Sequence, residues 1–299
     1  MTDPYLLHEA LPELDAPVLV GMLTGWIDAS GAAAAAIAMV ETACDARPLL
    51  TFDGDQFIDY RARRPTMELR DGVNTRLVWP EIELKVGRDP IGHDVLVLTG
   101  PEPDAAWHKF GEVVGDLAVE LGVRMAVILG AYPFATPHTR PSRLSTSSPS
   151  PELIANTDLL RNSVDVPAGM GAVLEHSLHE RDIPALGIWA QVPHYLGTMS
   201  YSAATVALLE GLGRVAGLSI DATLARNEAV IQRQRVDQLV ANNDEHTEMV
   251  RQMERAYDDL AEQRSTDAGS VNAAPIPTGD ELAAEFERFL RDQDDDAQD

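Results

Sequence analysis

Four apolar runs constrain the fold of this chain more than any other feature. Residues 18–25, 94–100, 125–130 and 185–192 are continuously apolar for most of their length, rather than alternately apolar and polar. A continuous run indicates a strand buried on both faces, whereas alternation is typical of a sheet with one wet face. Segments with helical spacing separate these runs. The sequence therefore predicts an α/β protein, a three-layer α/β/α sandwich with a mostly parallel sheet.

The remaining elements of this sandwich can be predicted from the same patterns. We expect a further strand at 47–53, and two strands within 75–87 that are joined around Pro80. Helices are expected in the intervals between the strands, at 29–43, 104–122, 171–182 and 201–217.

The character of the sequence changes after residue 218. Residues 221–264 contain no proline or glycine, so they predict one long helix, which at about 1.5 Å per residue would span some 60 Å. Such a helix would project from the body or pack against a partner. The expected organisation is an α/β domain over 1–218, a helical extension over 219–264, a flexible linker over 265–278, a short amphipathic helix over 279–293 and a disordered acidic tail over 294–299.

Charge and composition exclude several classes of function. A net charge of −25 disfavours binding to nucleic acid, which requires clustered Lys and Arg, and also to anionic membranes. Cys44 is the single cysteine, which fits a reducing compartment. The N-terminal residues lack the pattern of a signal peptide, and the alanine-rich segment 31–40 is about half of a membrane span. We therefore expect a cytoplasmic protein.

Polar residues follow several of the predicted strands and should meet at one edge of the sheet. Asp28, His138, Arg140 and His194 could bind phosphate or perform general acid–base chemistry there. The alternative is that His138 and Arg140 attach a long loop to the protein body or face a neighbouring subunit. We favour this alternative because no GxSxG nucleophile motif is present. Asp28 or Ser30 is also well placed to cap the alanine-rich helix.

Nucleotide and metal motifs are weak or absent. The sequence GWIDASG at 25–31 forms a predicted strand-to-helix turn, but neither GxGxxG nor GxxxxGK[ST] occurs there. The matching spacing at 211–217 falls inside a predicted helix. The sequence HSLH at 176–179 lacks the HExxH pattern and indicates a solvated helix face. We predict no cofactor and no metal ion.

Four motifs in order resemble the actinobacterial branch of the PAC2 family, which is named after proteasome assembly chaperone 2. They are GWIDASG (25–31), TGPEPDAAWHKF (99–110), LGAYPFATPHTRP (129–141) and IPALGIWAQVPHYLGTMSYSAA (183–204). The resemblance covers roughly residues 15–218. The family-motif residues at the expected edge are Gly25, Trp26, Asp28, Gly100, Pro101, Tyr132, Pro133, His138, Arg140, Pro193, His194 and Tyr195.

The resemblance implies a fold similar to purine nucleoside phosphorylases, a homo-oligomer such as a trimer, and a chaperone or scaffold role towards 20S proteasome α subunits. Archaeal relatives dock through a C-terminal hydrophobic-Tyr-any motif, whereas this sequence ends Asp-Asp-Ala-Gln-Asp. The expected function is thus non-enzymatic. A phosphorylase-like or hydrolase-like enzyme using the strand edge remains the alternative, and an ATP-dependent carboxylate–amine ligase is a weaker one.

Overall fold

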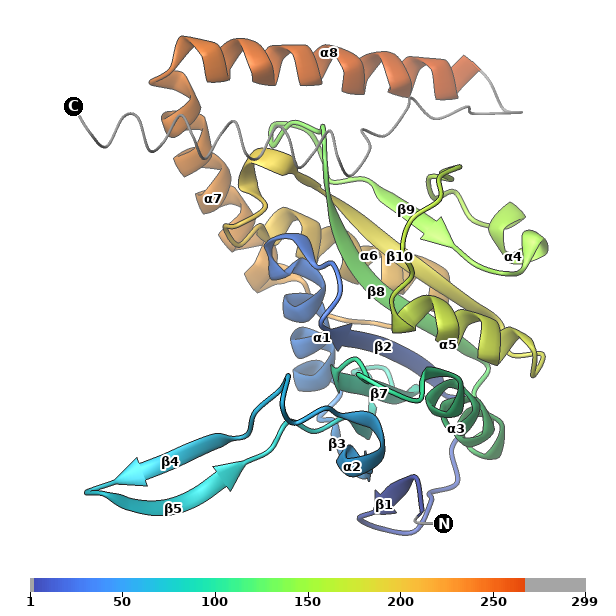
Figure 1. Cartoon of the computed structure of the whole chain (residues 1–299). Coiled ribbons are helices and arrows are strands. Elements are labelled where there is room, and N and C mark those ends of the chain that lie inside the picture. Colours follow the sequence, from blue (N-terminus) through green and yellow to red (C-terminus); the bar gives the residue numbers. More distant parts are fainter. Residues whose placement is uncertain (1–2, 267–299) are drawn as a thin grey trace.

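The computed structural model describes residues 3–266, and its centre is one eight-stranded sheet with the order β1-β3-β6-β7-β2-β8-β10-β9 (Figure 1). Its four central strands run parallel to one another. They are β7 (Asp94–Pro101), β2 (Val18–Thr24), β8 (Met125–Phe134) and β10 (Ala185–Pro193). These strands contain the four apolar runs, so the prediction of a parallel, buried centre is confirmed.

Antiparallel strands extend this centre on both sides. On one side lie β6 (Glu83–Arg88), β3 (Arg47–Phe52) and β1 (Tyr5–Leu7), and on the other lies β9 (Leu144–Ser147). Strands β1 and β9 are too short to show periodicity, and the sequence did not predict them. The same holds for the short helices α2 (Gly54–Phe57) and α4 (Pro151–Ala155) and the 3-10 turn η2 (His194–Leu196). The helix predicted at 29–43 begins with a 3-10 turn, η1 (Ala29–Gly31).

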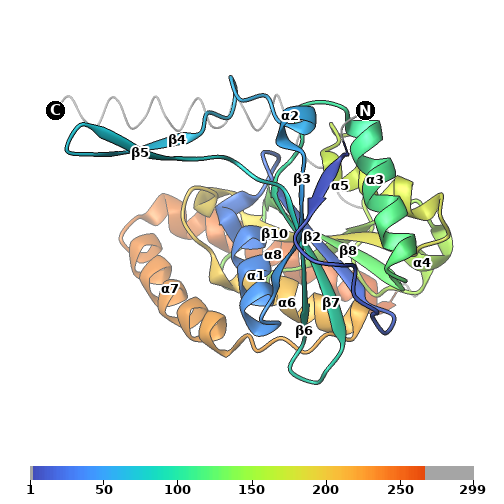
Figure 2. The ribbon, with the colours of Figure 1, turned by 90° about the horizontal axis from the view of Figure 1, so that it is seen from below.

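Helices cover both faces of the sheet, as the predicted three-layer sandwich requires (Figure 2). One face carries α1 (Ala32–Ala43) and α6 (Ser202–Ala216), and the other carries α3 (Trp107–Glu120) and α5 (Met170–His179). Neighbouring residues of β2 enter different cores, since Val18 and Val20 pack towards α1 whereas Leu19 packs towards α3. Each central strand therefore needs apolar side chains in both directions.

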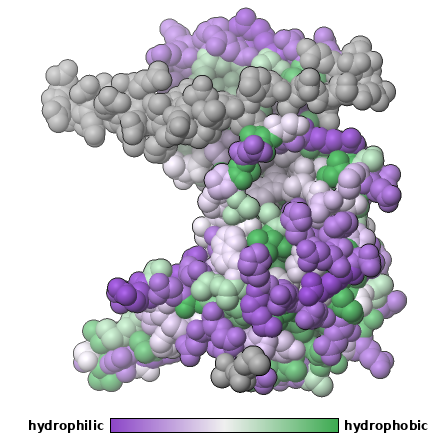
Figure 3. All heavy atoms as spheres, turned by 45° about the vertical axis from the view of Figure 1, so that its right-hand side comes forward, coloured by the Kyte–Doolittle hydropathy of each residue, from purple (hydrophilic) through white to green (hydrophobic). Residues whose placement is uncertain are grey.

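The segment around Pro80 forms two strands as predicted, but only one of them joins the sheet. Strand β5 (Val73–Val78) pairs instead with β4 (Thr66–Arg70) in a separate hairpin. Asp71 and Gly72 form its turn with φ values of 49° and 80°, the left-handed pair that favours a tight hairpin. The hairpin projects from the body and carries both hydrophobic and hydrophilic residues (Figures 1 and 3).

The prediction of one continuous helix over 221–264 is wrong. Two helices form, α7 (Thr223–Ala241) and α8 (Asp244–Thr266), and α8 lies across the end of the molecule at a steep angle to α7 (Figure 1). Asn242 ends α7, and the side chain of Asn243 accepts hydrogen bonds from the amides of Glu245 and His246. Asparagine caps helices in this way, so a helix can break without proline or glycine.

The predicted acidic tail (294–299), amphipathic helix (279–293) and most of the predicted linker (265–278) lie outside the described residues. Within residues 3–266, no helix is long and apolar enough to span a bilayer.

The aromatic cluster beneath α3 provides a test of the core. Phe110 is fully buried, with its ring centroid 4.8 Å from that of Phe52 and 5.2 Å from that of Phe57. We expect Phe110→Ala to lower the free energy of unfolding by about 3–5 kcal/mol in urea denaturation, because it removes buried surface and leaves a cavity. The control is Val119→Ala on the same helix, where the side chain is 55% exposed. Equal effects of the two substitutions would contradict this packing.

Candidate functional site

The carboxyl ends of the parallel strands lie at one edge of the sheet, and helices α7 and α8 pack near it (Figure 1). The segment between β8 and β9, residues 135–143, is here called the edge loop. It contains two of the predicted site residues, His138 and Arg140. The contacts of this loop show how the edge is built.

Of the two predicted caps of helix α1, Asp28 provides the cap, whereas the Ser30 hydroxyl donates to the Leu196 carbonyl at 2.9 Å. Its carboxylate accepts hydrogen bonds from the amides of Ala33 at 2.8 Å and Ala34 at 3.0 Å. Burial raises the pKa of Asp28, although these amide hydrogen bonds act in the opposite direction. The two carboxylate oxygens are thus engaged by the backbone of the alanine-rich helix.

His138 is buried between the body and α7. Its Nδ1 lies 2.7 Å from the Tyr195 hydroxyl, and its Nε2 lies 3.0 Å from Oδ1 of Asp237. The backbone amide of His138 also donates to the Tyr195 oxygen. A neutral imidazole satisfies this set, because Nε2–H can donate to Asp237 while Nδ1 accepts from Tyr195. Burial lowers the pKa of His138, against the effect of Asp237, and raises the pKa of Tyr195 to about 12.

Arg140 connects the edge loop to α8. Its Nε and Nη2 donate to the two carboxylate oxygens of Asp258, at 2.9 and 2.7 Å. Its Nη1 donates to Glu254 at 3.2 Å, and the hydroxyl of Thr139 donates to the same carboxylate. The bond to Asp258 raises the pKa of the Arg140 guanidinium. This fork-like geometry fixes both distance and orientation.

A second contact between the edge loop and α8 involves Tyr257. Its hydroxyl donates to the Pro141 carbonyl at 3.0 Å, and the Arg143 guanidinium lies 3.5 Å from its ring centroid. Arg143 also donates to the Tyr257 carbonyl at 2.8 Å. A cation over an aromatic face adds attraction to the hydrogen bonds.

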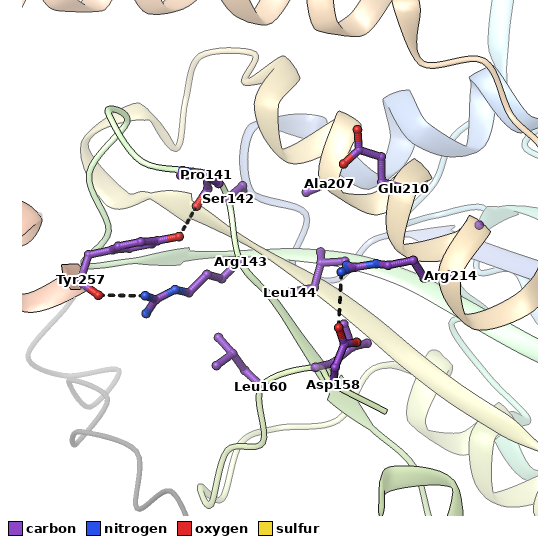
Figure 4. A pocket seen from close by; sticks show the side chains of 12 residues that line it. Pro141, Ser142, Arg143, Leu144, Asp158, Leu160, Ala207, Glu210, Arg214 and Tyr257 are labelled. Atoms are coloured by element: carbon purple, nitrogen blue, oxygen red, sulfur yellow. Dashed lines mark hydrogen bonds and ion pairs between the residues drawn. The ribbon is translucent and has the colours of Figure 1, made fainter. Parts of the chain in front are cut away.

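A cavity of about 630 Å³ opens beside this contact (Figure 4). It lies between the end of the edge loop, the segment 158–160, helix α6 and Tyr257, and an ion pair joins Arg214 to Asp158 across it at 3.6 Å. The lining residues are Pro141, Ser142, Arg143, Leu144, Asp158, Leu159, Leu160, Ala207, Glu210, Gly213, Arg214 and Tyr257.

The four predicted chemical residues do not form one catalytic cluster. Within residues 3–266, no hydrogen bond or ion pair joins any two of Asp28, His138, Arg140 and His194, and none of them lines the cavity. The His194 ring contacts the Tyr195 ring edge to face, with 5.5 Å between centroids. In the same described part of the chain, no group of three or more His, Cys, Asp or Glu side chains could hold a metal ion.

The sequence did not identify the partners of the edge loop. They are Asp237 on α7 and Glu254, Tyr257 and Asp258 on α8. In the sequence they form part of a charged amphipathic helix, and charges of that kind usually face solvent. No motif distinguishes them, because their role depends on where α8 lies after the break at Asn243.

Glycines allow close backbone approach at the ends of β2 and β7. Gly25 has φ +118°, and a Cβ there would lie 2.7 Å from Nη2 of Arg63. Gly100 has φ +131°, and a Cβ there would lie 2.4 Å from the Glu81 carbonyl oxygen. Both positions have a φ that is unfavourable for other residues, which explains glycine in these two motifs. At Gly100 a backbone clash adds to this, whereas the Arg63 side chain near Gly25 could move aside.

The other motif residues contact the segments that surround the edge. The Tyr132 hydroxyl lies 3.2 Å from Oγ of Ser145 and accepts a hydrogen bond from Gln191 at 3.1 Å. Trp26 is 43% exposed and packs against Gly169, where no side chain intervenes. Three prolines lie at or near the strand ends: Pro101, Pro133 and Pro193.

Fold and edge together define a three-layer α/β protein whose edge loop is held by helices α7 and α8. Residues 22–240 match the PAC2 family. The crystal structure of Rv2714 from Mycobacterium tuberculosis, a protein of unknown function, is 33% identical, with 88% of this chain and 91% of that chain covered and a TM-score of 0.78. This chain belongs to the PAC2 family, as its motifs predicted.

Two further solved structures are similar. The proteasome-assembly chaperone homologue Rv2125 from Mycobacterium tuberculosis is 30% identical, with 78% of this chain and 99% of that chain covered and a TM-score of 0.72. The archaeal proteasome activator PbaB from Pyrococcus furiosus is 15% identical, with 79% of this chain and 97% of that chain covered and a TM-score of 0.61. At this identity, the similarity shows a shared fold alone. No curated protein matches this chain.

Substitution of Arg140 tests the attachment of α8. We expect Arg140→Ala to lower the free energy of unfolding by no more than about 1 kcal/mol but to speed amide hydrogen exchange in residues 244–266, because a half-exposed bidentate pair is lost. The control is Arg251→Ala on α8, whose guanidinium has one pair with Glu248 at 3.8 Å. Exchange in α8 that is no faster for Arg140→Ala than for the control would refute the attachment.

Proposed function

We propose that this protein is a non-enzymatic assembly chaperone or scaffold that binds α subunits of a 20S proteasome. The observation that carries the proposal is the match to the chaperone homologue Rv2125, which extends over 99% of that chain at 30% identity. The fold shared with an archaeal proteasome activator is consistent with it. A cytoplasmic location is part of the proposal, since the single cysteine is unpaired.

The contacts at the edge support binding over catalysis. His138 and Arg140 are engaged by carboxylates of α7 and α8, and Asp28 is engaged by the backbone of α1. A catalytic group must reach a substrate. If these side chains turned away from their present partners towards a substrate, buried or partly buried charges would lose their hydrogen bonds. The arrangement therefore favours a rigid surface.

We further propose that the protein is a homo-oligomer, with a trimer as the expected form. The β4–β5 hairpin exposes apolar side chains, among them Met67 at 52%, Val73 at 61% and Leu77 at 43%. An isolated two-stranded hairpin is marginally stable in water and gains stability when a partner covers one face. A second copy of the chain is the partner that closed symmetry supplies.

Binding to α subunits can be measured directly. We expect the purified protein to form a complex with separately expressed proteasome α subunits of its source organism at micromolar concentration, detected by size-exclusion chromatography with light scattering. The β subunits alone serve as the control, and they should not bind. Absence of any complex with α subunits, together with micromolar binding of phosphate or a nucleoside in calorimetry, would favour the enzymatic alternative.

The hairpin can be tested by charge placement on its two faces. Met67 and Leu77 form a cross-strand pair, and Glu68 and Arg76 form the next one. We expect Met67→Asp with Leu77→Asp to reduce a trimer to a monomer of 32.5 kDa in light scattering, because charge opposes burial of this face. The matched control exchanges the second pair, Glu68→Arg with Arg76→Glu, and should keep the trimer. A monomeric wild-type protein would defeat the proposal.

One observation favours the alternative of a small-molecule enzyme. The cavity of about 630 Å³ has the size typical of ligand sites and contains several charged side chains. Two of its cations already have partners, because Arg143 contacts Tyr257 and Arg214 pairs with Asp158. No observation favours the ATP-dependent ligase.

A further inference from the structure

A carboxyl group is buried beneath the edge strand β9. Glu175 on α5 is 4% exposed, and its Oε1 accepts a hydrogen bond from the Ser147 hydroxyl at 3.0 Å. The indole N–H of Trp189 on β10 donates to the same hydroxyl oxygen at 3.3 Å. Ser147 ends β9 and is exposed, so this one hydroxyl lies between the buried carboxyl and solvent.

The space that these groups share exists because residue 187 is glycine. A Cβ at Gly187 would lie 2.6 Å from the Ser147 oxygen and 2.7 Å from both Oε1 of Glu175 and Nε1 of Trp189. The three polar atoms therefore converge where any other residue would place its side chain. The Trp189 ring in turn lies against Gly130 of β8. The cluster is built from close packing on three adjacent strands and one helix.

No cation among the elements packed here balances a charge on Glu175. Strands β8, β9 and β10 contain no charged residue. On α5 itself, His176 and His179 are exposed, and across it on α3 the Asp116 carboxylate is engaged by Arg181. The other charged residues of α3 are His108, Lys109, Glu112 and Glu120, and none of them contributes to the titration of Glu175. Burial raises the pKa of Glu175 from 4.5 to about 7, and only the bond from Ser147 opposes this.

Strand β9 is held firmly to β10 on its inner side, where the Thr146 hydroxyl also donates to the Gly187 carbonyl at 2.9 Å, but its outer edge makes few bonds. It pairs with β10 over Leu144–Ser147, and its outer edge meets a single residue, Leu160. The amide of Thr146 donates to the Leu160 carbonyl, and the Leu160 amide donates to the Leu144 carbonyl, both at 2.9 Å. The outer edge of a short edge strand, bonded to one residue only, is the part of such an element that opens most readily.

We propose that Glu175 is a proton-controlled latch on strand β9, closed when its carboxyl is neutral and opened when the carboxyl ionises. A neutral carboxyl can keep its hydrogen bond with Ser147 without the free-energy cost of burying a charge. An ionised one would retain a single hydrogen bond and no cation, so it gains from contact with water. The route to water that requires the least rearrangement passes through Ser147 at the end of β9.

Opening of β9 also alters the cavity beside it. Leu144 and Leu160, which bound the strand at its start and along its outer edge, are both lining residues of that cavity. The latch therefore links the protonation of a buried side chain to the shape of the cavity of about 630 Å³. This link holds whether or not the protein binds proteasome subunits.

The pH dependence follows from the direction of the pKa shift. Below the ordinary pKa of 4.5, the buried neutral carboxyl gives the closed form its full stability relative to the open form. This contribution to stability is lost as the pH rises through about 7, the pKa of Glu175 in the closed form. Between pH 6 and pH 8, linkage between an open carboxyl at 4.5 and a closed one at about 7 predicts that the opening equilibrium constant increases about tenfold.

The test is hydrogen exchange of the Thr146 and Leu160 amides in the full chain, measured at pH 6 and pH 8 and corrected for the intrinsic exchange rate. We expect protection of both amides to fall about tenfold in the wild type and to be independent of pH in Glu175→Gln. The matched control is Glu152→Gln, an exposed glutamate on α4, which should behave as the wild type does. Protection that is independent of pH in the wild type, or a tenfold loss that persists in Glu175→Gln, would overturn the latch.

The wild-type arm of a second measurement does not depend on the folding of a variant. Carbon-13 NMR of the glutamate side-chain carboxyls should show one group in the wild type that titrates near pH 7, and that group should move to higher pH in Ser147→Ala, because the hydroxyl that stabilises the carboxylate is lost. Titration of every glutamate near or below 4.5 in the wild type would reject the proposal.

Discussion

Burial of four adjacent parallel strands on both faces is the constraint on which the rest of this structure depends. Strands β7, β2, β8 and β10 have apolar side chains in both directions, so helices must cover both faces of the sheet. Parallel strands need crossover connections, which the covering helices supply, and their carboxyl ends then meet at one edge. The position of the candidate site is thus a consequence of how the core is buried.

That edge is covered by the C-terminal helices rather than left open. Helix α7 contributes Asp237, and α8 contributes Glu254, Tyr257 and Asp258, to contacts with one loop. The chain has 23 Lys and Arg residues against 48 Asp and Glu residues. Two of these cations, Arg140 and Arg143, lie on the edge loop and contact α8. The same residues that could have served chemistry are used to attach the helices, which is why we place function on the surfaces of the protein.

Two regions beyond this edge have distinct physical properties. The β4–β5 hairpin exposes apolar side chains on an element that is too small to be stable on its own, so its energetics favour a covered state. The Glu175 cluster has the opposite character, since a polar group is buried with a single partner. The hairpin and the Glu175 cluster are independent features of the same fold. The hairpin is suited to binding a partner, whereas the cluster is suited to responding to pH.

Sequence alone determined the class of fold, the central strands, the covering helices and the family, because continuous apolar runs and fixed motifs depend on local spacing. It also narrowed the cap of α1 to Asp28 or Ser30, of which Asp28 provides it, since capping acts between near neighbours in the chain. Only the tertiary structure decided the pairing of β5 with β4, the break at Asn242 and Asn243, and the partners of His138 and Arg140. Asp237 and Asp258 lie about 100 residues or more from their partners. Contacts over such a separation depend on where whole elements pack, and no local pattern of residue types records that packing.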